Sequence, residues 1–208
     1  MIPLRSWPRL LARQSEAWGH KAMGRIKYLQ LEDLQPEHRN IPRMTSNITR
    51  AVAHSPVLAN LVAARGMYFR HQSGLNPRLR ELAILQVGYS TRSAYEWAHH
   101  VDVALSFGVS RDDIRAIGVE SEGGETHLEP LARVVLAATR ELTDHITLSG
   151  ERFDQLAQAL SSEHLVDLLV TIGEYIGLVR VMAAIEIDLE PEYAPFLQEF
   201  PLPATGRL

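Results

Sequence analysis

The chain has 208 residues, of which 46% are apolar and 22% charged, and its formal net charge is −4. These values are typical of a globular protein with one substantial core, and the charge argues against a nucleic-acid surface. Because the sequence contains no cysteine, disulfides, thiolate nucleophiles and cysteine-ligated zinc are excluded.

The N-terminal segment, residues 1–39, is expected to contain a short amphipathic helix followed by an extended connector from Leu31 to Pro42. Residues 1–27 carry six Lys or Arg against one Glu and lack the long apolar core of a secretion signal. The most apolar later stretch, residues 165–187, is interrupted by four charged side chains, too many for a membrane span. We therefore expect a cytoplasmic protein that binds no membrane.

Helical periodicity dominates from Thr45 onward, and no alternating strand pattern is present, which predicts an all-α fold. The first helical pattern runs to about Arg70, with a break at Ser55-Pro56 because the residue before proline avoids helical geometry. The next helix starts at Asn76-Pro77, an N-cap followed by proline at the first helical position. A third helix is predicted from Ser93 to Phe107, where Gly108 stops it.

Capping residues also predict where several of the remaining helices begin. Ser110 caps a short helix, with Asp113 three residues on as a near capping box. Residues 120–130 form a polar loop, and helices are predicted over 129–146, from Ser149 to about Leu160, and from Ser161 or Ser162 to about Leu189. The Pro-rich tail, residues 191–208, is expected to be irregular. No internal repeat or linker divides the chain, so a single domain is predicted, with its core in residues 40–190.

The helix over residues 93–107 carries an unusual pair on its packed face. Glu96 and His100 lie four residues apart on the same side as Val103, Ala104 and Phe107, whereas the opposite side is polar. An ionised carboxylate in an apolar setting costs several kcal/mol unless it is paired. The spacing therefore predicts a direct interaction between Glu96 and His100, which could also be purely structural.

The preceding helix adds a second carboxylate. Glu81 lies in a helix that is apolar in nearly every direction, as is typical of a central, buried helix. An acid in a first helical turn is also favoured by the helix dipole, which would by itself account for Glu81. If both carboxylates and the imidazole face one space, they can share protons, and their environments would set acid and base roles.

The sequence contains no established motif for binding a metal ion or a phosphate group. Glu96, His99 and His100 offer ligands, but the HExxH spacing of zinc proteases is absent. The stretch "SEGGE" follows no strand and lacks the lysine of a phosphate-binding loop. We expect no metal and no cofactor.

Three stretches resemble the carboxymuconolactone decarboxylase family, a branch of the alkylhydroperoxidase D-like (AhpD-like) superfamily. They are "AHSPVLANL", "LNPRLRELAILQVGYSTRSAYEWAHHVDVALSFGVSRDDIRAI" and "LVDLLVTIGEYIGLVRVMAAI", within about Asn40 to Glu190. The resemblance implies an all-α, multi-helix AhpD-like bundle that assembles as a homo-oligomer, a trimer, hexamer or dimer. The peroxidases of this superfamily carry Glu, then CxxC, then His, and here Ser93 and Glu96 replace the two cysteines. Peroxide reduction by thiols is therefore excluded.

What survives of that motif is a set of carboxylates and an imidazole, as in the decarboxylase branch. The resemblance implies a small-molecule substrate and a cofactor-free lyase reaction on an unsaturated lactone or organic acid. The resemblance implies that His100 is the acid/base, that Glu96 is its partner or orients it, and that Glu81 is a second proton-transfer group. Residues expected to contact the substrate or line the pocket are Ser93, Trp97, His99, Arg80 (or Arg78, for a carboxylate) and Tyr175. Hydrolysis, hydration or isomerisation, and a non-catalytic ligand-binding oligomer, remain open alternatives.

Overall fold

The computed structural model describes residues 24–203, and this part of the chain contains α-helices and short 3-10 turns but no β-strand. The all-α prediction is confirmed. The predicted N-terminal amphipathic helix lies outside the described residues. No helix within them is long and apolar enough to span a membrane.

The helices begin and end close to the predicted positions. In chain order they are α2 (Asn47–Val52), α3 (Pro56–His71), α4 (Pro77–Thr91), α5 (Ala94–Ser106), α6 (Arg111–Ser121), α7 (Pro130–Asp144), α8 (Gly150–Ala159), α9 (Ser162–Ala184) and α10 (Ala194–Glu199). Three 3-10 turns accompany them, η2 (Leu31–Asp33), η3 (Pro36–His38) and η4 (Pro191–Tyr193).

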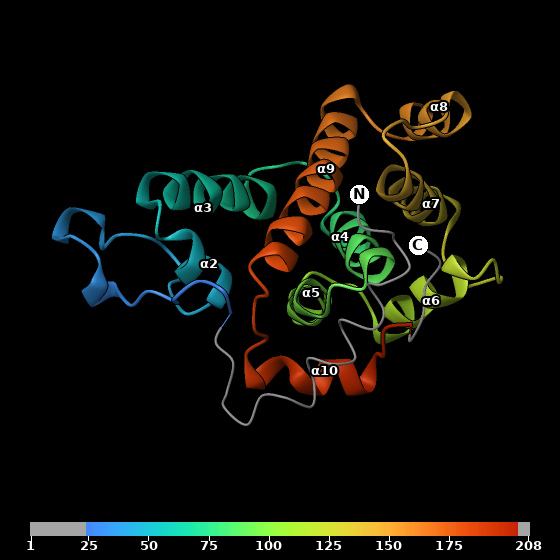
Figure 1. Cartoon of the computed structure of the whole chain (residues 1–208). Coiled ribbons are helices and arrows are strands. Elements are labelled where there is room, and N and C mark those ends of the chain that lie inside the picture. Colours follow the sequence, from blue (N-terminus) through green and yellow to red (C-terminus); the bar gives the residue numbers. More distant parts are fainter. Residues whose placement is uncertain (1–23, 204–208) are drawn as a thin grey trace, which may run out of the picture.

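Helix α4 is the centre of the bundle. It packs against α5, α6, α7 and α9, which surround it in Figure 1. Every residue from Leu79 to Gly88 is buried, as the all-round apolar pattern predicted. The one buried amide among them, Gln86, is hydrogen-bonded to Ser90, Ser121 and Arg140. The helix therefore reaches the core without an unsatisfied polar group at this position.

The predicted helix starts are formed by side-chain caps. Asn76 accepts hydrogen bonds from the first-turn amides of α4, and Ser93 accepts one from the amide of Glu96. Ser110 and Asp113 form a reciprocal capping box at α6. Gly108, with φ +87°, ends the turn after α5, a backbone conformation that glycine adopts without a steric cost.

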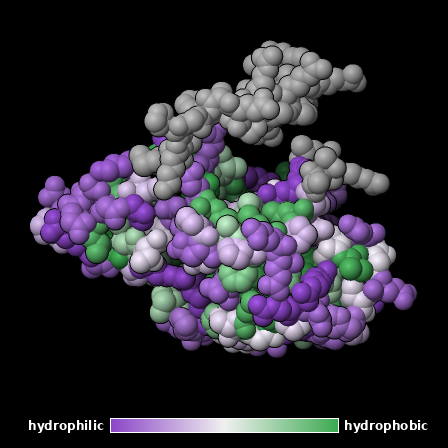
Figure 2. All heavy atoms as spheres, turned by 90° about the horizontal axis from the view of Figure 1, so that it is seen from below, coloured by the Kyte–Doolittle hydropathy of each residue, from purple (hydrophilic) through white to green (hydrophobic). Residues whose placement is uncertain are grey.

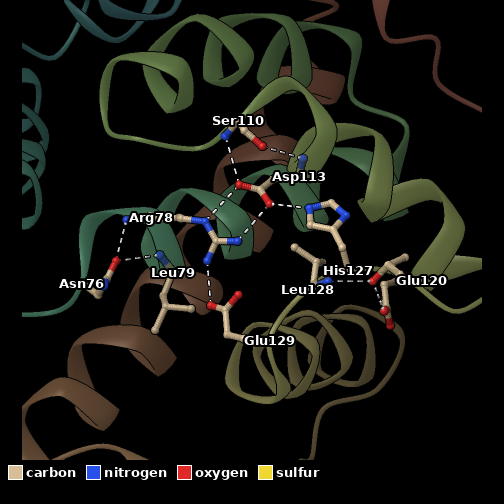
Figure 3. Close-up of polar contacts among 10 residues, drawn as sticks. Asn76, Arg78, Leu79, Ser110, Asp113, Glu120, His127, Leu128 and Glu129 are labelled. Atoms are coloured by element: carbon tan, nitrogen blue, oxygen red, sulfur yellow. Dashed lines mark hydrogen bonds and ion pairs between the residues drawn. The ribbon is translucent and has the colours of Figure 1, made fainter.

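A polar cluster joins the start of α4 to α6 and α7 (Figure 3). The Arg78 guanidinium donates to both carboxylate oxygens of Asp113, at 3.0 and 2.9 Å, and to Glu129 at 2.6 Å. His127 lies 3.1 Å from the same Asp113 carboxylate. Three nitrogens of the Arg78 guanidinium thus hold helices together, and its predicted contact with a substrate carboxylate has no support in this geometry.

Close approach of α4 and α5 depends on Gly88. A Cβ atom at this position would lie 3.1 Å from the backbone nitrogen of Trp97, tighter than ordinary contact. The missing side chain lets α5 lie against α4. This contact brings Glu81 on α4 within reach of α5.

Three local predictions are wrong, each because distant residues supply contacts. The extended connector contains the turns η2 and η3. Helix α9 ends at Ala184 rather than Leu189, because Asp188 is bound by Tyr28 and Glu190 by the backbone of Asn47. Part of the tail is helical rather than irregular, in η4 and α10.

Helices α2 and α3 form a lobe beside α9, apart from the main bundle (Figure 1). The lobe has a small apolar cluster of its own, made by Leu34, Ile41, Ala53 and Ala59. On the face drawn in Figure 2, hydrophobic patches lie among hydrophilic side chains. The space between this lobe and the bundle is where the candidate site lies.

Candidate functional site

The imidazole of His100 lies between two carboxylates from two helices. Its Nδ1 lies 2.8 Å from Oε2 of Glu81 on α4, and its Nε2 lies 3.0 Å from Oε1 of Glu96, one turn earlier on α5. All three side chains are almost fully buried. Glu81, Glu96 and His100 therefore meet in one place, as the helical pattern predicted.

The two carboxylate contacts differ in quality. The Glu81 contact has hydrogen-bond geometry, whereas the Glu96 contact is close enough for an ion pair but leaves Oε1 without a hydrogen-bond partner among the described residues. A buried carboxylate oxygen without a hydrogen bond is costly. Glu96 is therefore the less satisfied carboxylate of the two.

The surroundings push the pKa values of the two carboxyl groups in opposite directions. Burial raises the pKa of Glu81, but the hydrogen bond and charge of His100, with the charge of Arg80, outweigh burial and lower it. Burial raises the pKa of Glu96, and the nearby histidines do not offset that effect. Burial lowers the pKa of His100, but Glu96 and Glu81 outweigh it, so that the pKa is raised. Two carboxyl groups whose pKa values are shifted in opposite directions usually take different roles in proton transfer.

Arg80 binds the Glu81 carboxylate and is not one of the residues that line the cavity. Its Nε donates to Oε1 of Glu81 at 2.9 Å, its Nη1 donates to the Phe69 carbonyl at 2.6 Å, and its guanidinium lies over the Phe107 ring. Arg80 is buried and does not line the cavity. It compensates the Glu81 charge, and the structure gives no surface on which it could contact a substrate.

A cavity of about 300 Å³ opens beside this triad, between the α2–α3 lobe and helices α5 and α9. Glu96, His99, His100 and Tyr175 line it, together with mainly apolar side chains. Glu81 is not among the lining residues and lies behind His100. A cavity of this size matches the lower end of small-ligand sites.

Tyr175 and His99 flank the triad. The Tyr175 ring stands edge-on to His100, with centroids 5.0 Å apart, and burial keeps its hydroxyl protonated by raising the pKa. His99 is stacked between the rings of Tyr95 and Tyr193, and its Nε2 lies 2.7 Å from Glu190. The segment after α9 thereby holds one edge of the cavity.

Two predicted pocket residues lie elsewhere. Trp97 is buried against Tyr89, and its indole nitrogen donates to the carbonyl of Phe200 at 2.8 Å. Ser93 is the N-cap of α5 and does not line the cavity. Both side chains turn away from it because each makes a structural contact on another side of the helix. The cavity therefore gives no support to the predicted roles of Ser93 and Trp97 in substrate binding, which stay predictions.

Sequence reasoning missed the side chains that the lobe contributes. Arg65 and Arg70 on α3 line the cavity, as does Glu174 on α9. Arg65 and Glu174 form an ion pair. The only sequence signal was their helical spacing, and nothing local indicated that α3 would cover His100.

Within residues 24–203, no group of three or more His, Asp or Glu side chains is arranged to hold a metal ion.

Comparison with known proteins agrees with the geometry. The model of the carboxymuconolactone decarboxylase family matches residues 56–141, from the start of α3 into α7. No curated protein sequence matches the chain. The matched segment includes Glu81, Glu96 and His100. The resemblance is therefore confirmed over residues 56–141, which match the carboxymuconolactone decarboxylase family, and the described residues form an all-α bundle consistent with the AhpD-like fold in a chain without cysteine.

Proposed function

We propose that the protein is a cofactor-free acid/base lyase that acts on a small unsaturated lactone or organic acid in the cavity beside His100. The observation that carries this proposal is the His100 imidazole held between two carboxylates of opposite pKa shift at the wall of an apolar cavity. The match of residues 56–141 to the carboxymuconolactone decarboxylase family makes a decarboxylase-like reaction the first choice.

The geometry supports a division of labour that differs from the expected one. Glu81 hydrogen-bonds Nδ1 of His100 and is itself held by Arg80, so it orients the ring and stabilises its charged form. Glu96 lines the cavity and has a raised pKa, so it is the carboxyl group suited to exchange a proton with Nε2. His100 then delivers or removes the proton at the substrate.

Decarboxylation needs little else from the protein. The bond between the carboxylate carbon and the adjacent carbon breaks, CO2 leaves, and the electron pair delocalises into the lactone carbonyl as an enolate. Protonation of that carbon by the His100 imidazolium forms the product, Glu96 then gives a proton to Nε2, and Glu96 regains from solvent the one proton that each turnover consumes. The substrate carbonyl is the electron sink, so the mechanism needs no bound cofactor. The apolar wall strengthens every electrostatic interaction with the enolate.

The same three groups could instead run hydrolysis, hydration or isomerisation, since each also requires one positioned proton donor and acceptor. A non-catalytic oligomer that binds a small ligand is the alternative from a different class. The raised pKa of the cavity-lining Glu96 favours proton transfer over a purely structural pair.

The test is turnover of carboxylated enol-lactones and β-keto acids by purified protein treated with chelator, with CO2 release and loss of the lactone chromophore as readouts. We expect CO2 release that His100→Ala abolishes. Conversion of the lactone without CO2 would identify hydrolysis or isomerisation. Binding without any conversion would overturn the lyase proposal.

A further inference from the structure

One cation in the cavity has no counter-charge. Arg70, near the C-terminal end of α3, is half-buried and lines the cavity. Among the residues that the structure describes, none forms a hydrogen bond or ion pair with its guanidinium. Its charge nevertheless acts on the site, because it opposes protonation of His100. Burial lowers the pKa of Arg70 itself, and neighbouring Arg43 adds to the effect.

The other charges near the triad are matched. Arg65 is paired with Glu174, Arg80 with Glu81, and the two carboxylates flank His100. Arg43 also lines the cavity but is exposed at its rim. Arg70 is therefore a half-buried positive charge in this cavity that no carboxylate of the described residues pairs with. Half-buried guanidinium groups are normally matched by carboxylates.

The helix also makes room for this side chain. A Cβ atom at Gly66, one turn before Arg70, would lie 2.8 Å from Nη2 of the guanidinium. Glycine inside a helix costs about 1 kcal/mol relative to alanine. A side chain at Gly66 would displace the guanidinium from this position, so the glycine leaves Arg70 room beside the cavity that both residues line.

We propose that Arg70 is an anion-binding subsite that holds a carboxylate of the ligand, and that this carboxylate is retained in the product. The inference rests on the proposed function for the second part of this statement. A guanidinium that pairs with a carboxylate stabilises it more than it stabilises neutral CO2, so pairing with the departing group would slow its loss. The ligand therefore carries an acidic group in addition to the part that faces His100. One half-buried guanidinium suits a single carboxylate, because the two charges match.

The probes are furan-2-carboxylate and its neutral amide, two flat five-membered oxygen heterocycles of nearly the same shape. Their affinities are measured by titration calorimetry at low ionic strength for wild type, Arg70→Gln and the double variant Arg65→Gln/Glu174→Gln. The double variant is the matched control, because it removes an arginine from the same cavity together with its partner. Arg70→Met, which keeps the apolar stem, replaces Arg70→Gln if that variant does not fold.

We expect wild type to bind the carboxylate at least about 10-fold more tightly than the amide, the usual scale of a charge-assisted hydrogen bond. Arg70→Gln should reduce this ratio to near one, and the double variant should keep it. The proposal is overturned if the Arg70 variant keeps the preference, if the control loses it equally, or if wild type binds neither probe at millimolar concentration.

These outcomes are separable from those of the lyase test. If Arg70→Gln loses the preference for the carboxylate and the wild-type protein converts no substrate, the anion subsite is supported and the lyase proposal is rejected. If turnover depends on His100 but Arg70→Gln keeps the preference for the carboxylate, the lyase proposal is supported and the anion subsite is rejected.

Discussion

Oε2 of Glu81 lies 2.8 Å from Nδ1 of His100, and the hydrogen bond joins α4 to α5 in the interior of the protein. Both side chains are almost completely buried. The interaction sets which ring nitrogen faces the core carboxylate and leaves Nε2 on the side of Glu96. The proton state of His100 is therefore the first quantity to measure.

We expect the His100 imidazole to titrate above its usual value near 6.5 when it is followed by NMR of the ring protons. Removing one flanking negative charge in Glu96→Gln should lower that pKa, because the carboxylate favours the imidazolium. A His100 pKa below 6.5 in the wild-type protein would contradict the assignment.

The same shift predicts a pH-dependent stability. Because the pKa of His100 is raised in the folded protein, its stabilising contribution is complete below the unfolded value of 6.5 and is lost as the pH rises through the folded value. The difference in the free energy of unfolding between wild type and His100→Ala should therefore narrow above this range. Urea titrations at several pH values measure it, and a difference that widens with pH would count against the buried ion pair.

If His100 and Glu96 act as one acid/base unit, His100→Ala and Glu96→Gln should each reduce turnover by about 100-fold or more. Their combined loss should be far smaller than the product of the single losses, since residues that act together are non-additive. Thermal unfolding of each variant must accompany the kinetics, because removing one partner of a buried pair destabilises the fold. A folded His100→Ala protein with full activity would make the pair structural.

Ser93 should behave as a cap and not as a ligand contact. Ser93→Ala removes the acceptor for the Glu96 amide and should lower the free energy of unfolding by about 1 kcal/mol. Affinity for furan-2-carboxylate should stay unchanged, because Ser93 does not line the cavity. Ser106→Ala, at the exposed other end of α5, is the matched control for stability. Weaker ligand binding in a stable Ser93→Ala protein would restore its role in the site.

Asp113 should be a stability residue with an acid-dependent effect. Burial raises its pKa, but the hydrogen bonds from Arg78, Ser110 and His127 outweigh burial, so the pKa is lowered. Its contribution is therefore present above the unfolded value of 3.8 and is lost as the pH falls further toward the folded value.

Asp113→Asn should accordingly lower the free energy of unfolding by about 2 kcal/mol at neutral pH, and the gap to wild type should close in acid. The exposed neighbour Asp112 provides the control in Asp112→Asn, for which we expect little change. Equal effects of the two substitutions in urea titrations would show that the cluster in Figure 3 is not what holds α4 to α6.

Light scattering should detect a homo-oligomer at micromolar concentration. Within the described residues, α3 and α9 expose several large apolar side chains, Val57, Leu58, Leu61, Met67, Val166, Val170 and Val181. Such patches mark association surfaces. Leu61→Glu should shift the protein toward the monomer, whereas Val119→Glu, at an exposed apolar position on α6, should not. A wild-type monomer would contradict this expectation.

Much of the fold follows from local signals. The starts of α4, α5 and α6 could be placed from Asn76, Ser93 and Ser110 because a cap involves only residues within one turn. The burial of Glu81 could be inferred because α4 is apolar all round. The interaction of Glu96 with His100 follows from the four-residue spacing, which is a property of any α-helix.

The sequence by itself therefore determined the helices, the absence of thiol chemistry and the inward face that carries Glu96 and His100. Only the tertiary structure decided that Glu81 and not Glu96 hydrogen-bonds His100, that Trp97 turns toward Phe200, and that Arg70 enters the cavity. The physical reason is that caps and spacing act within a few residues, whereas these contacts depend on how α4 and α10 pack against α5 and on how α3 lies across the cavity. That packing is the sum of many burial and hydrogen-bond terms between residues far apart in the chain.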